Sequence, residues 1–391
     1  MLNKSRGRII LFGEHSDWMV QYSLKYDYIP RRILGLASSI NIGMNYRAIE
    51  KDGNIVTFES ANSNGVRSTY FSDKDTRSFE KWTSISEKLL NIAVSAAYDY
   101  IGKKKGIKNY EDDESCKGVD IIVISQDLPI KRGLASSTCM VRAIIYELIR
   151  ANGALSITTD SDLCDLMQYV EAVVNETNAE SDIIINRAPE LSLVTHSSVI
   201  PVIGASTKIY DKVGGFADKI MYSDGAEDNL VLIDIGEKAL NTDYIITSLS
   251  RPFKDDSVSE QCTKDIANLF GETTTNYSTL AANIIANAID LHTVYKDLGY
   301  LMWEFQKQYT SVIMHNTQYL PSAIADHKAN KILKILMDEG LIYGGKVTGS
   351  HADSIILAST QYTADFINNK LKTSNKLRQK SELNDVKVIN I

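Results

Sequence analysis

Hydrophobic and polar positions along the chain follow two kinds of pattern. Short apolar runs typical of strands cover residues 7–12, 40–48, 55–59 and 119–125. Before the last of these runs, residues 79–101 place apolar side chains, including Leu89 and Ala93, at helical spacing. This arrangement predicts a mixed α/β or α+β protein rather than a helical bundle.

Glycines divide the apolar segment GLIYGGKVTGSHADSIILA, residues 340–358. Its glycine and lysine spacing approaches that of a P-loop, but Val347 stands where a P-loop needs Ser or Thr. The predicted helix also precedes this segment, whereas a P-loop opens a helix, so we reject the motif. We predict a turn at 344–345, a strand, a second turn at 349–350 and another strand.

Composition is that of an ordinary soluble protein with one very large domain or two medium domains. The 391 residues are 44% hydrophobic and 23% charged, with a formal net charge of −7. A net negative chain without a long basic block argues against nucleic-acid binding. The basic run 103–105 is interpreted as a solvated helix end.

Cysteine spacing and hydropathy give no sign of a zinc site, a disulfide framework or a membrane span. The four cysteines are Cys116, Cys139, Cys164 and Cys262, and none belongs to a CxxC motif. No segment approaches the roughly 20 apolar residues that a membrane helix needs. We therefore expect reduced thiols and a cytoplasmic protein.

Polar residues crowd the end of the first predicted strand, in RGRIILFGEHSDWM (residues 6–19). Glu14, His15 and Asp17 follow the apolar run directly. Carboxylates and an imidazole form several directed hydrogen bonds, which suits a polyol better than an apolar substrate. The alternative is structural: Glu14 and Asp17 cap a helix or pair with cations, and His15 lies in the core.

A second cluster of polar residues follows the strand at 119–125, in LPIKRGLASSTCMVRAIIYELI. Pro129 ends the strand, Gly133 permits a tight turn, and residues 136–138 are hydroxyl side chains where a helix begins. Unpaired N–H groups at a helix start, and the helix dipole, favour phosphate there. The alternative is that a serine merely caps the helix.

These three segments, in this order, resemble those of the GHMP small-molecule kinases (galactokinase, homoserine kinase, mevalonate kinase and phosphomevalonate kinase). The galactokinase pattern PGRxNLxGEHxDY is similar to Gly7-Arg8, Gly13-Glu14-His15 and Asp17-Trp18, and the loop PxxxGLxSS matches Pro129, Gly133, Leu134, Ser136 and Ser137. The late motif TGxGxGG matches only at Thr348-Gly349, because His351, Ala352 and Asp353 replace glycines. The resemblance covers nearly the whole chain.

The resemblance implies an α+β, two-lobed GHMP kinase fold. An N-terminal α+β lobe, residues 1–205, carries the sugar motif and the phosphate loop. A C-terminal ferredoxin-like lobe covers residues 206–391. The implied activity is that of an ATP-dependent sugar kinase, which phosphorylates a hydroxyl of a galactose-like or related monosaccharide. ATP, Mg²⁺ and the sugar are its expected ligands, and neither nucleic acid nor a membrane is an expected partner.

The resemblance also assigns roles to individual residues. The catalytic residues are Asp218 and Arg8; the sugar contacts are Glu14, His15 and Asp17; the ATP contacts are Gly133, Leu134, Ala135, Ser136, Ser137, Thr138 and Trp82; and the Mg²⁺ ligands are Ser137 and Glu171. Asp211 competes with Asp218 for the catalytic role, but its spacing to the next strand favours Asp218. For Trp82 the alternative role is core packing.

Three alternatives to a galactose-like sugar kinase stay open. One is a galactokinase-like sensor that binds sugar and ATP without transferring phosphate, because the late motif is altered. The others are a GHMP kinase for another small alcohol or for an acidic sugar. Arg31 and Arg32 lie in an insertion relative to galactokinases and either pair with an anionic substrate or remain solvated at the surface.

Overall fold

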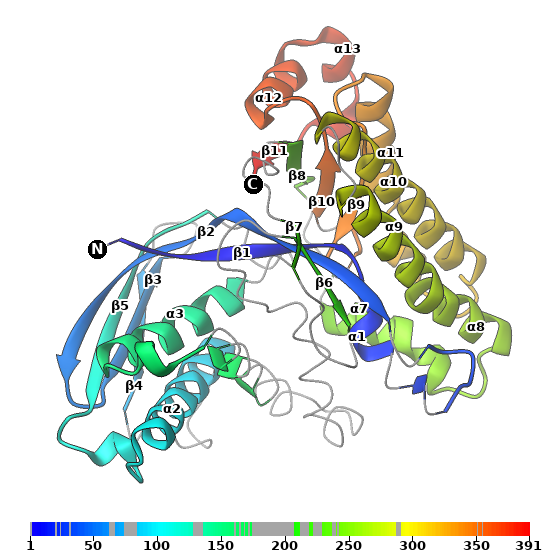
Figure 1. Cartoon of the computed structure of the whole chain (residues 1–391). Helices are drawn as coiled ribbons and strands as arrows, with labels where there is room; N and C mark the ends of the chain where they lie inside the picture. The colour runs from blue at the N-terminus through cyan, green and yellow to red at the C-terminus, as the bar shows by residue number, and fades with distance from the viewer. Residues whose placement is uncertain are drawn as a thin grey trace. The chain divides into compact units, whose positions relative to one another are not determined.

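The structure is a computed structural model whose contacts group the chain into two compact units (Figure 1). It describes residues 2–19, 22–23, 25–30, 33–61, 67–73, 84–127, 136–159, 162–163, 166–167, 169–170, 173, 207–211, 219–221, 229–236, 240, 242–286, 291–349, 351–353 and 355–391. Unit 1 comprises Met1–Gly7, Ile42–Pro129 and Ala135–Pro201, and unit 2 comprises Arg8–Asn41, Ile130–Leu134 and Val202–Ile391. Both units therefore combine segments that are distant in the sequence.

Two long strands contribute residues to both units. They are β1 (Asn3–Phe12) and β2 (Leu34–Asp52). The other regular elements of unit 1 are β3 (Val56–Ala61), β4 (Arg67–Ser72), α2 (Ile85–Lys105), η3 (Tyr110–Asp112), β5 (Lys117–Gln126), α3 (Ser136–Ala151) and η4 (Leu155–Ile157).

The sheet of unit 1 has both parallel and antiparallel neighbours. Strand β5 pairs with β3 in parallel and with β2 antiparallel, and β4 lies antiparallel to β3. Helices α2 and α3 pack against each other and against these strands (Figure 1). Buried apolar residues of α2 such as Leu90, Ala93 and Ala97 form its inner face. The apolar helical spacing therefore corresponds to a packed face, as expected for an amphipathic helix.

Both ends of α2 are fixed by local sequence. At its start Ser84 Oγ accepts a hydrogen bond of 3.2 Å from Glu87 N, and the Glu87 carboxylate accepts one of 3.0 Å from Ser84 N. This reciprocal capping box satisfies two helix-end N–H groups. At its end Gly106 adopts a left-handed φ of 71°, after the exposed lysines 103–105. The interpretation of the lysine run as a solvated helix end is confirmed.

Unit 2 contains the second half of the chain and the short helix α1 (Ser16–Met19). Its further elements are β6 (Thr207–Asp211), β7 (Lys219–Met221), β8 (Leu230–Asp234), α7 (Thr242–Ser250), η7 (Arg251–Phe253), α8 (Glu260–Asn268), the π-helical η8 (Leu269–Thr273), α9 (Thr274–Ala286), α10 (Leu291–His315), η9 (Ser322–Ile324), α11 (His327–Asp338), β9 (Gly344–Thr348), β10 (Ile355–Ser359), α12 (Ala364–Thr373), α13 (Asn375–Arg378), η10 (Ser381–Leu383) and β11 (Lys387–Asn390).

Two sheet regions lie in unit 2. The first part of β2 pairs with β6, and β6 pairs with β7. A separate antiparallel sheet has the order β11-β8-β10-β9, and α10 and α11 pack on it (Figure 1). Its core includes Ile233, Leu333 and Ile356, each 0% exposed. On the β9 edge, Gln306 Oε1 of α10 accepts a hydrogen bond of 2.8 Å from Val347 N, so the helix covers an N–H group that an open edge would expose.

The strand predictions are confirmed within a few residues, except that β2 extends from residue 34 to 52 instead of 40 to 48. The helix predicted at 79–101 begins at Ile85 in the described residues and ends four residues later than predicted. The turn predicted at 344–345 is wrong, because Gly344 begins strand β9. A Cβ at Gly344 would lie 2.1 Å from the carbonyl oxygen of Gly299, so this glycine permits close helix packing rather than a turn.

The structure describes three of the four cysteines and the helices that were searched for membrane spans. Cys116, Cys139 and Cys262 are buried thiols that form no disulfide in the described part of the chain. Among the described residues, no helix is both long and apolar enough to cross a membrane.

Candidate active site

The candidate site in unit 2 begins where β1 ends. Gly13, with φ 115°, turns the chain out of the strand, and His15 follows with φ 62°. Residues other than glycine adopt this left-handed conformation uncommonly, although histidine does so more often than most, so the turn has a modest backbone cost. Glu14 and His15 are nevertheless 4% and 6% exposed, which places both polar side chains inside the unit.

Glu14 forms a buried ion pair with Lys346 of β9. The Glu14 Oε1 atom contacts Lys346 Nζ, and the two side chains are 2% and 0% exposed. Lys346 Nζ also donates to Val347 O at 3.0 Å. Glu14 Oε2 is buried and has no hydrogen-bond partner among the described residues. The lysine balances the carboxylate charge, and the second oxygen is an acceptor facing no donor that the structure describes.

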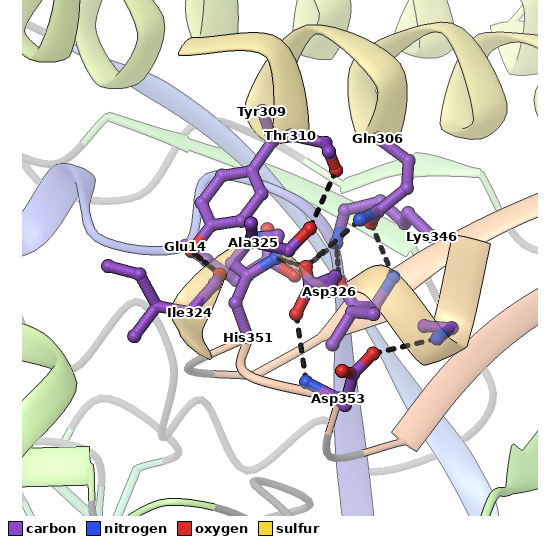
Figure 2. Close-up of polar contacts among 12 residues, drawn as sticks. Glu14, Gln306, Tyr309, Thr310, Ile324, Ala325, Asp326, Lys346, His351 and Asp353 are labelled. Atoms are coloured by element: carbon purple, nitrogen blue, oxygen red, sulfur yellow. Dashed lines mark hydrogen bonds and ion pairs between the residues drawn. The ribbon is translucent and has the colours of Figure 1, made fainter. Parts of the chain in front are cut away.

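A second buried polar group joins α10 to the two loops before α11 and β10 (Figure 2). The Asp326 carboxylate contacts His351 Nδ1 at 2.7 Å and accepts hydrogen bonds from Gln306 Nε2 at 2.9 Å and Asp353 N at 2.8 Å. An ionised carboxylate only accepts hydrogen bonds, so we assign the His351 proton to Nδ1. Its Nε2 atom is then an acceptor in the neutral ring.

Asp353 supplies the cap of α11. Its Oδ1 accepts a hydrogen bond of 2.7 Å from Ala329 N, and its Oδ2 accepts one of 3.3 Å from Lys328 N. These are N–H groups of the first helical turn, where a carboxylate is also favoured by the helix dipole. Asp353 therefore ties the loop after β9 to the start of α11.

In the loop after β9, the backbone conformation is unfavourable for the residues that occupy it. Gly349 has φ 82°, and His351, Ala352 and Asp353 have φ 66°, 60° and 53°. Each residue with a side chain costs about 1–2 kcal/mol in this left-handed region, whereas glycine adopts it freely. His351 and Asp353, at glycine positions of the late motif, and Ala352 between them thus keep a glycine-like backbone, held by the contacts of Asp353 and His351.

Aromatic rings surround the two histidines. The Tyr309 ring stacks on His351 with centroids 3.7 Å apart, and His15 lies 5.7 Å from His351 and 5.0 Å from Phe270. Phe270 belongs to the π-helical turn η8, a type of distortion common at functional sites. Trp18 Nε1 donates to His15 Nδ1 at 3.2 Å, which assigns the proton of neutral His15 to Nε2.

Tyr309 stays protonated in this environment. Burial raises the pKa of its hydroxyl well above 10, and the nearby carboxylates of Asp326 and Asp353 raise the pKa further. The hydroxyl donates to Ile324 O at 2.9 Å. Tyr309 is therefore an uncharged side chain that this hydrogen bond holds in place at the candidate site.

The structure describes only some of the residues predicted from the sequence. It brings Glu14 and His15 together in one buried cluster. Arg8 lies in β1, Asp17 in α1 and Asp211 at the end of β6, but their side chains are outside the described part. Gly133, Leu134, Ala135, Trp82, Glu171, Asp218, Arg31 and Arg32 lie outside the described residues.

The predicted phosphate loop meets the start of α3 at Ser136. Backbone placement puts Ser136, Ser137 and Thr138 in the first turn, and that turn contains no acidic residue. The dipole of a 16-residue helix favours an anionic phosphate at this end. Among the described residues, no three His, Cys, Asp or Glu side chains form a group that could hold a metal ion.

Sequence reasoning missed Lys346, Asp326 and Tyr309. The sequence contains one signal for Lys346, which lies between glycines and apolar residues in the segment that forms β9. A charged residue in such a buried segment needs a buried partner. Asp326 and Tyr309 carry no such signal, because each acts through contacts made by the tertiary fold. His351 was noted only as a missing glycine.

Comparison with known proteins gives the fold. Residues 87–185 match the family model of the GHMP kinases N terminal domain. One similar structure is a galactokinase of Lactococcus lactis solved with galactose, with a TM-score of 0.63 and 13% sequence identity. The matched region covers 99% of this chain and 92% of the galactokinase chain. A mevalonate kinase has a TM-score of 0.60 at 16% identity, with 100% and 98% covered.

A third similar structure is a D-glycero-D-manno-heptose 1-phosphate kinase from Bacteriodes thetaiotaomicron, with a TM-score of 0.52, 13% identity, and 100% and 94% covered. No curated protein sequence matches the chain. The predicted α+β fold and its resemblance to these kinases are confirmed.

Proposed function

Because the chain has the GHMP kinase fold and carries a match to that family's N-terminal domain, we propose that it is an ATP-dependent sugar kinase. It transfers the γ-phosphoryl group of ATP to a hydroxyl of a neutral or modified monosaccharide. The division into lobes 1–205 and 206–391 is part of this proposal.

The observation that carries the sugar assignment is the buried carboxylate of Glu14. Its charge is balanced by Lys346, and its Oε2 has no hydrogen-bond partner among the described residues. A hydroxyl donor satisfies such an oxygen, and the bond to a charged acceptor contributes about 1.5–3 kcal/mol. His15 lies beside it with its proton on Nε2. The galactokinase among the similar structures was solved with galactose, which supports a sugar in this role.

The remaining roles come from the family resemblance. Asp218 takes or orients the proton of the attacking hydroxyl, Arg8 stabilises the negative charge that develops, and Asp17 accepts a further sugar hydroxyl. The turn at 133–135 and the first turn of α3 bind the phosphates of ATP, and Trp82 contacts its base. When bound, Mg²⁺ neutralises phosphate charge, and Ser137 and Glu171 would hold it.

The test is sugar-dependent release of ADP. The protein is incubated with ATP, Mg²⁺ and a panel of neutral, N-acetylated and acidic sugars, with mevalonate and homoserine included as other alcohols. We expect turnover with a sugar and none with the other alcohols. Asp218→Asn should lower turnover about 100-fold or more while sugar and ATP still bind. Turnover with mevalonate alone would contradict the sugar assignment.

A sugar sensor is the second candidate, favoured by the replaced glycines of the late motif. The structure weakens that argument, because residues 351–353 keep the left-handed backbone that glycines would adopt. Calorimetry separates the two functions. Tight sugar binding without ADP release in the presence of ATP and Mg²⁺ would support the sensor and contradict the kinase.

A further inference from the structure

His351 occupies a position that the proposed function leaves unused. It stands where the related kinases have a glycine, and its side chain is 0% exposed. A buried imidazole at φ 66° combines an unfavourable backbone with desolvation of a polar ring. Such a residue needs compensating contacts on both sides of the ring.

The contacts on one side are complete. The Nδ1 atom pairs with Asp326 at 2.7 Å, and the ring stacks on Tyr309 at 3.7 Å with an interplanar angle of 9°. Asp326 is itself fixed by Gln306 Nε2 and Asp353 N. The imidazole is therefore held in one orientation and one tautomer, with Nε2 as its acceptor atom.

On the other side of the His351 ring, the contacts are incomplete among the described residues. His351 Nε2 is buried and has no hydrogen-bond partner among the described residues, and the same holds for Glu14 Oε2. The His15 ring, next to Glu14 in the chain, stacks against His351 at 5.7 Å. Two buried acceptors without donors thus belong to one cluster in unit 2 (Figure 2).

We propose that the Asp326–His351 pair is a substrate-recognition element whose Nε2 accepts a hydrogen bond from a sugar hydroxyl, beside the hydroxyl bound by Glu14. This rests on the proposed function and narrows the substrate to a neutral polyol. Two acceptor atoms require two donors, which hydroxyl groups supply. An ionised carboxylate or phosphate group has no donor for either acceptor.

The experiment measures binding without turnover, by calorimetry at pH 8. The probes are D-galactose, D-mannose, L-arabinose and D-galacturonic acid, followed by the monodeoxy analogues of the neutral sugar that binds best. The variants are His351→Asn and His351→Gly, because both residues tolerate a left-handed backbone. Ala352→Gly is the matched control, since it changes the same loop and removes no polar atom. ATP binding monitors folding of every variant.

For the wild-type protein we expect one deoxy analogue to bind about tenfold or more weakly than its parent. The His351→Asn and His351→Gly variants should bind the parent sugar about tenfold or more weakly than the wild-type protein does. They should also bind the parent sugar and this deoxy analogue with the same affinity. Ala352→Gly should retain the wild-type pattern. In kinetics the two His351 variants should raise the KM for sugar more than they lower kcat.

Other outcomes overturn the proposal. If the His351 variants keep the full discrimination, or weaken every sugar equally, His351 is structural and the kinase assignment still stands. The same conclusion follows if the wild-type protein prefers D-galacturonic acid. If the wild-type protein binds no sugar and releases no ADP with any of them, the proposed function fails, and this inference fails with it.

Discussion

At the scale of residues, the candidate site contains several features that by themselves lower the stability of a folded protein. It contains a buried lysine and glutamate, two histidines at positive φ, and a loop with three consecutive side chains in the left-handed region. Specific contacts offset most of these costs, such as Lys346 for Glu14 and Asp326 for His351, whereas the methyl group of Ala352 can form no hydrogen bond or ion pair. Replacing one member of a contact should therefore have a larger effect than the same change at the surface.

The ion pair between Lys346 and Glu14 gives the first prediction. Lys346→Met removes the cation that contacts Glu14 Oε1, and among the described residues the buried carboxylate is left without a compensating charge. The free energy of unfolding should fall by about 3–5 kcal/mol, measured by urea denaturation. Adding Glu14→Gln should recover a large part of the loss.

A surface pair provides the control for that measurement. Lys117 contacts Asp52 at 2.5 Å, with side chains 34% and 95% exposed. Lys117→Met should leave the urea midpoint nearly unchanged, because solvent screens this pair. Equal effects of the two lysine substitutions would contradict the argument from burial.

The loop after β9 gives the second prediction. Ala352, at φ 60°, makes no side-chain hydrogen bond, so Ala352→Gly removes backbone strain at little cost in contacts. The protein should become more stable by about 1 kcal/mol, seen as a higher Tm. Ala358→Gly in strand β10 should act in the opposite direction, since glycine weakens a strand interior. A lower Tm for Ala352→Gly would show that the loop is not strained.

At the scale of elements, glycines decide how closely α10 approaches the sheet. Gly299 of α10 and Gly344 of β9 face each other, and a Cβ at Gly299 would lie 3.0 Å from Gly344 N. The helix that carries Gln306 and Tyr309 is thereby brought close to the strand that carries Lys346. Packing at this contact positions the site.

The third prediction concerns this contact. Gly344→Ala should destabilise the protein by about 1–3 kcal/mol and raise the KM for substrate, because the helix must move away from the strand. Gly340→Asn is the control, since Gly340 has φ 66° and open space around the added Cβ. Asparagine tolerates that backbone, so its effect on Tm and KM should be small. Similar effects of the two substitutions would contradict close packing as the reason for Gly344.

Local pattern predicts elements well and contacts between them poorly. The runs at 7–12 and 119–125 and the helix start at Ser136 follow from periodicity and turn residues. The paired glycines at 344–345 look like a turn in sequence, because a close approach by Gly299 cannot be read from neighbouring residues. Glu14 is recognisable as a polar residue after a strand, but its partner lies 332 positions away.

At the scale of the whole molecule, buried thiols lie in both compact units. Cys116 and Cys139 belong to unit 1, and Cys262 belongs to unit 2. Burial, together with the nearby Asp265, raises the pKa of the Cys262 thiol to about 11. Alkylation of these cysteines therefore reports on the folding of each unit.

The fourth prediction follows from that distribution. Because the pKa of the buried Cys262 thiol lies well above 8, the thiol is mostly protonated at pH 8, and iodoacetamide should not modify it in the native protein. In increasing urea, Cys116 and Cys139 should become reactive together, because both lie in compact unit 1, and Cys262 should follow the loss of helix α8 structure. Mass spectrometry of peptides identifies each site. Modification of native Cys262 at the rate of a free thiol would contradict its burial.

Unit 2 combines segments from the beginning and the end of the chain, and this affects when it can form during biosynthesis. Its Arg8–Asn41 segment leaves the ribosome early, whereas Lys346 is added 332 residues after Glu14. At a rate of about 5–20 residues per second, about 17–66 s pass between the synthesis of Glu14 and that of Lys346, which pairs its charge. During that interval Glu14 remains hydrated and the unit is incomplete. Nascent chains halted before residue 346 should therefore depend on chaperones to a degree that the finished protein does not.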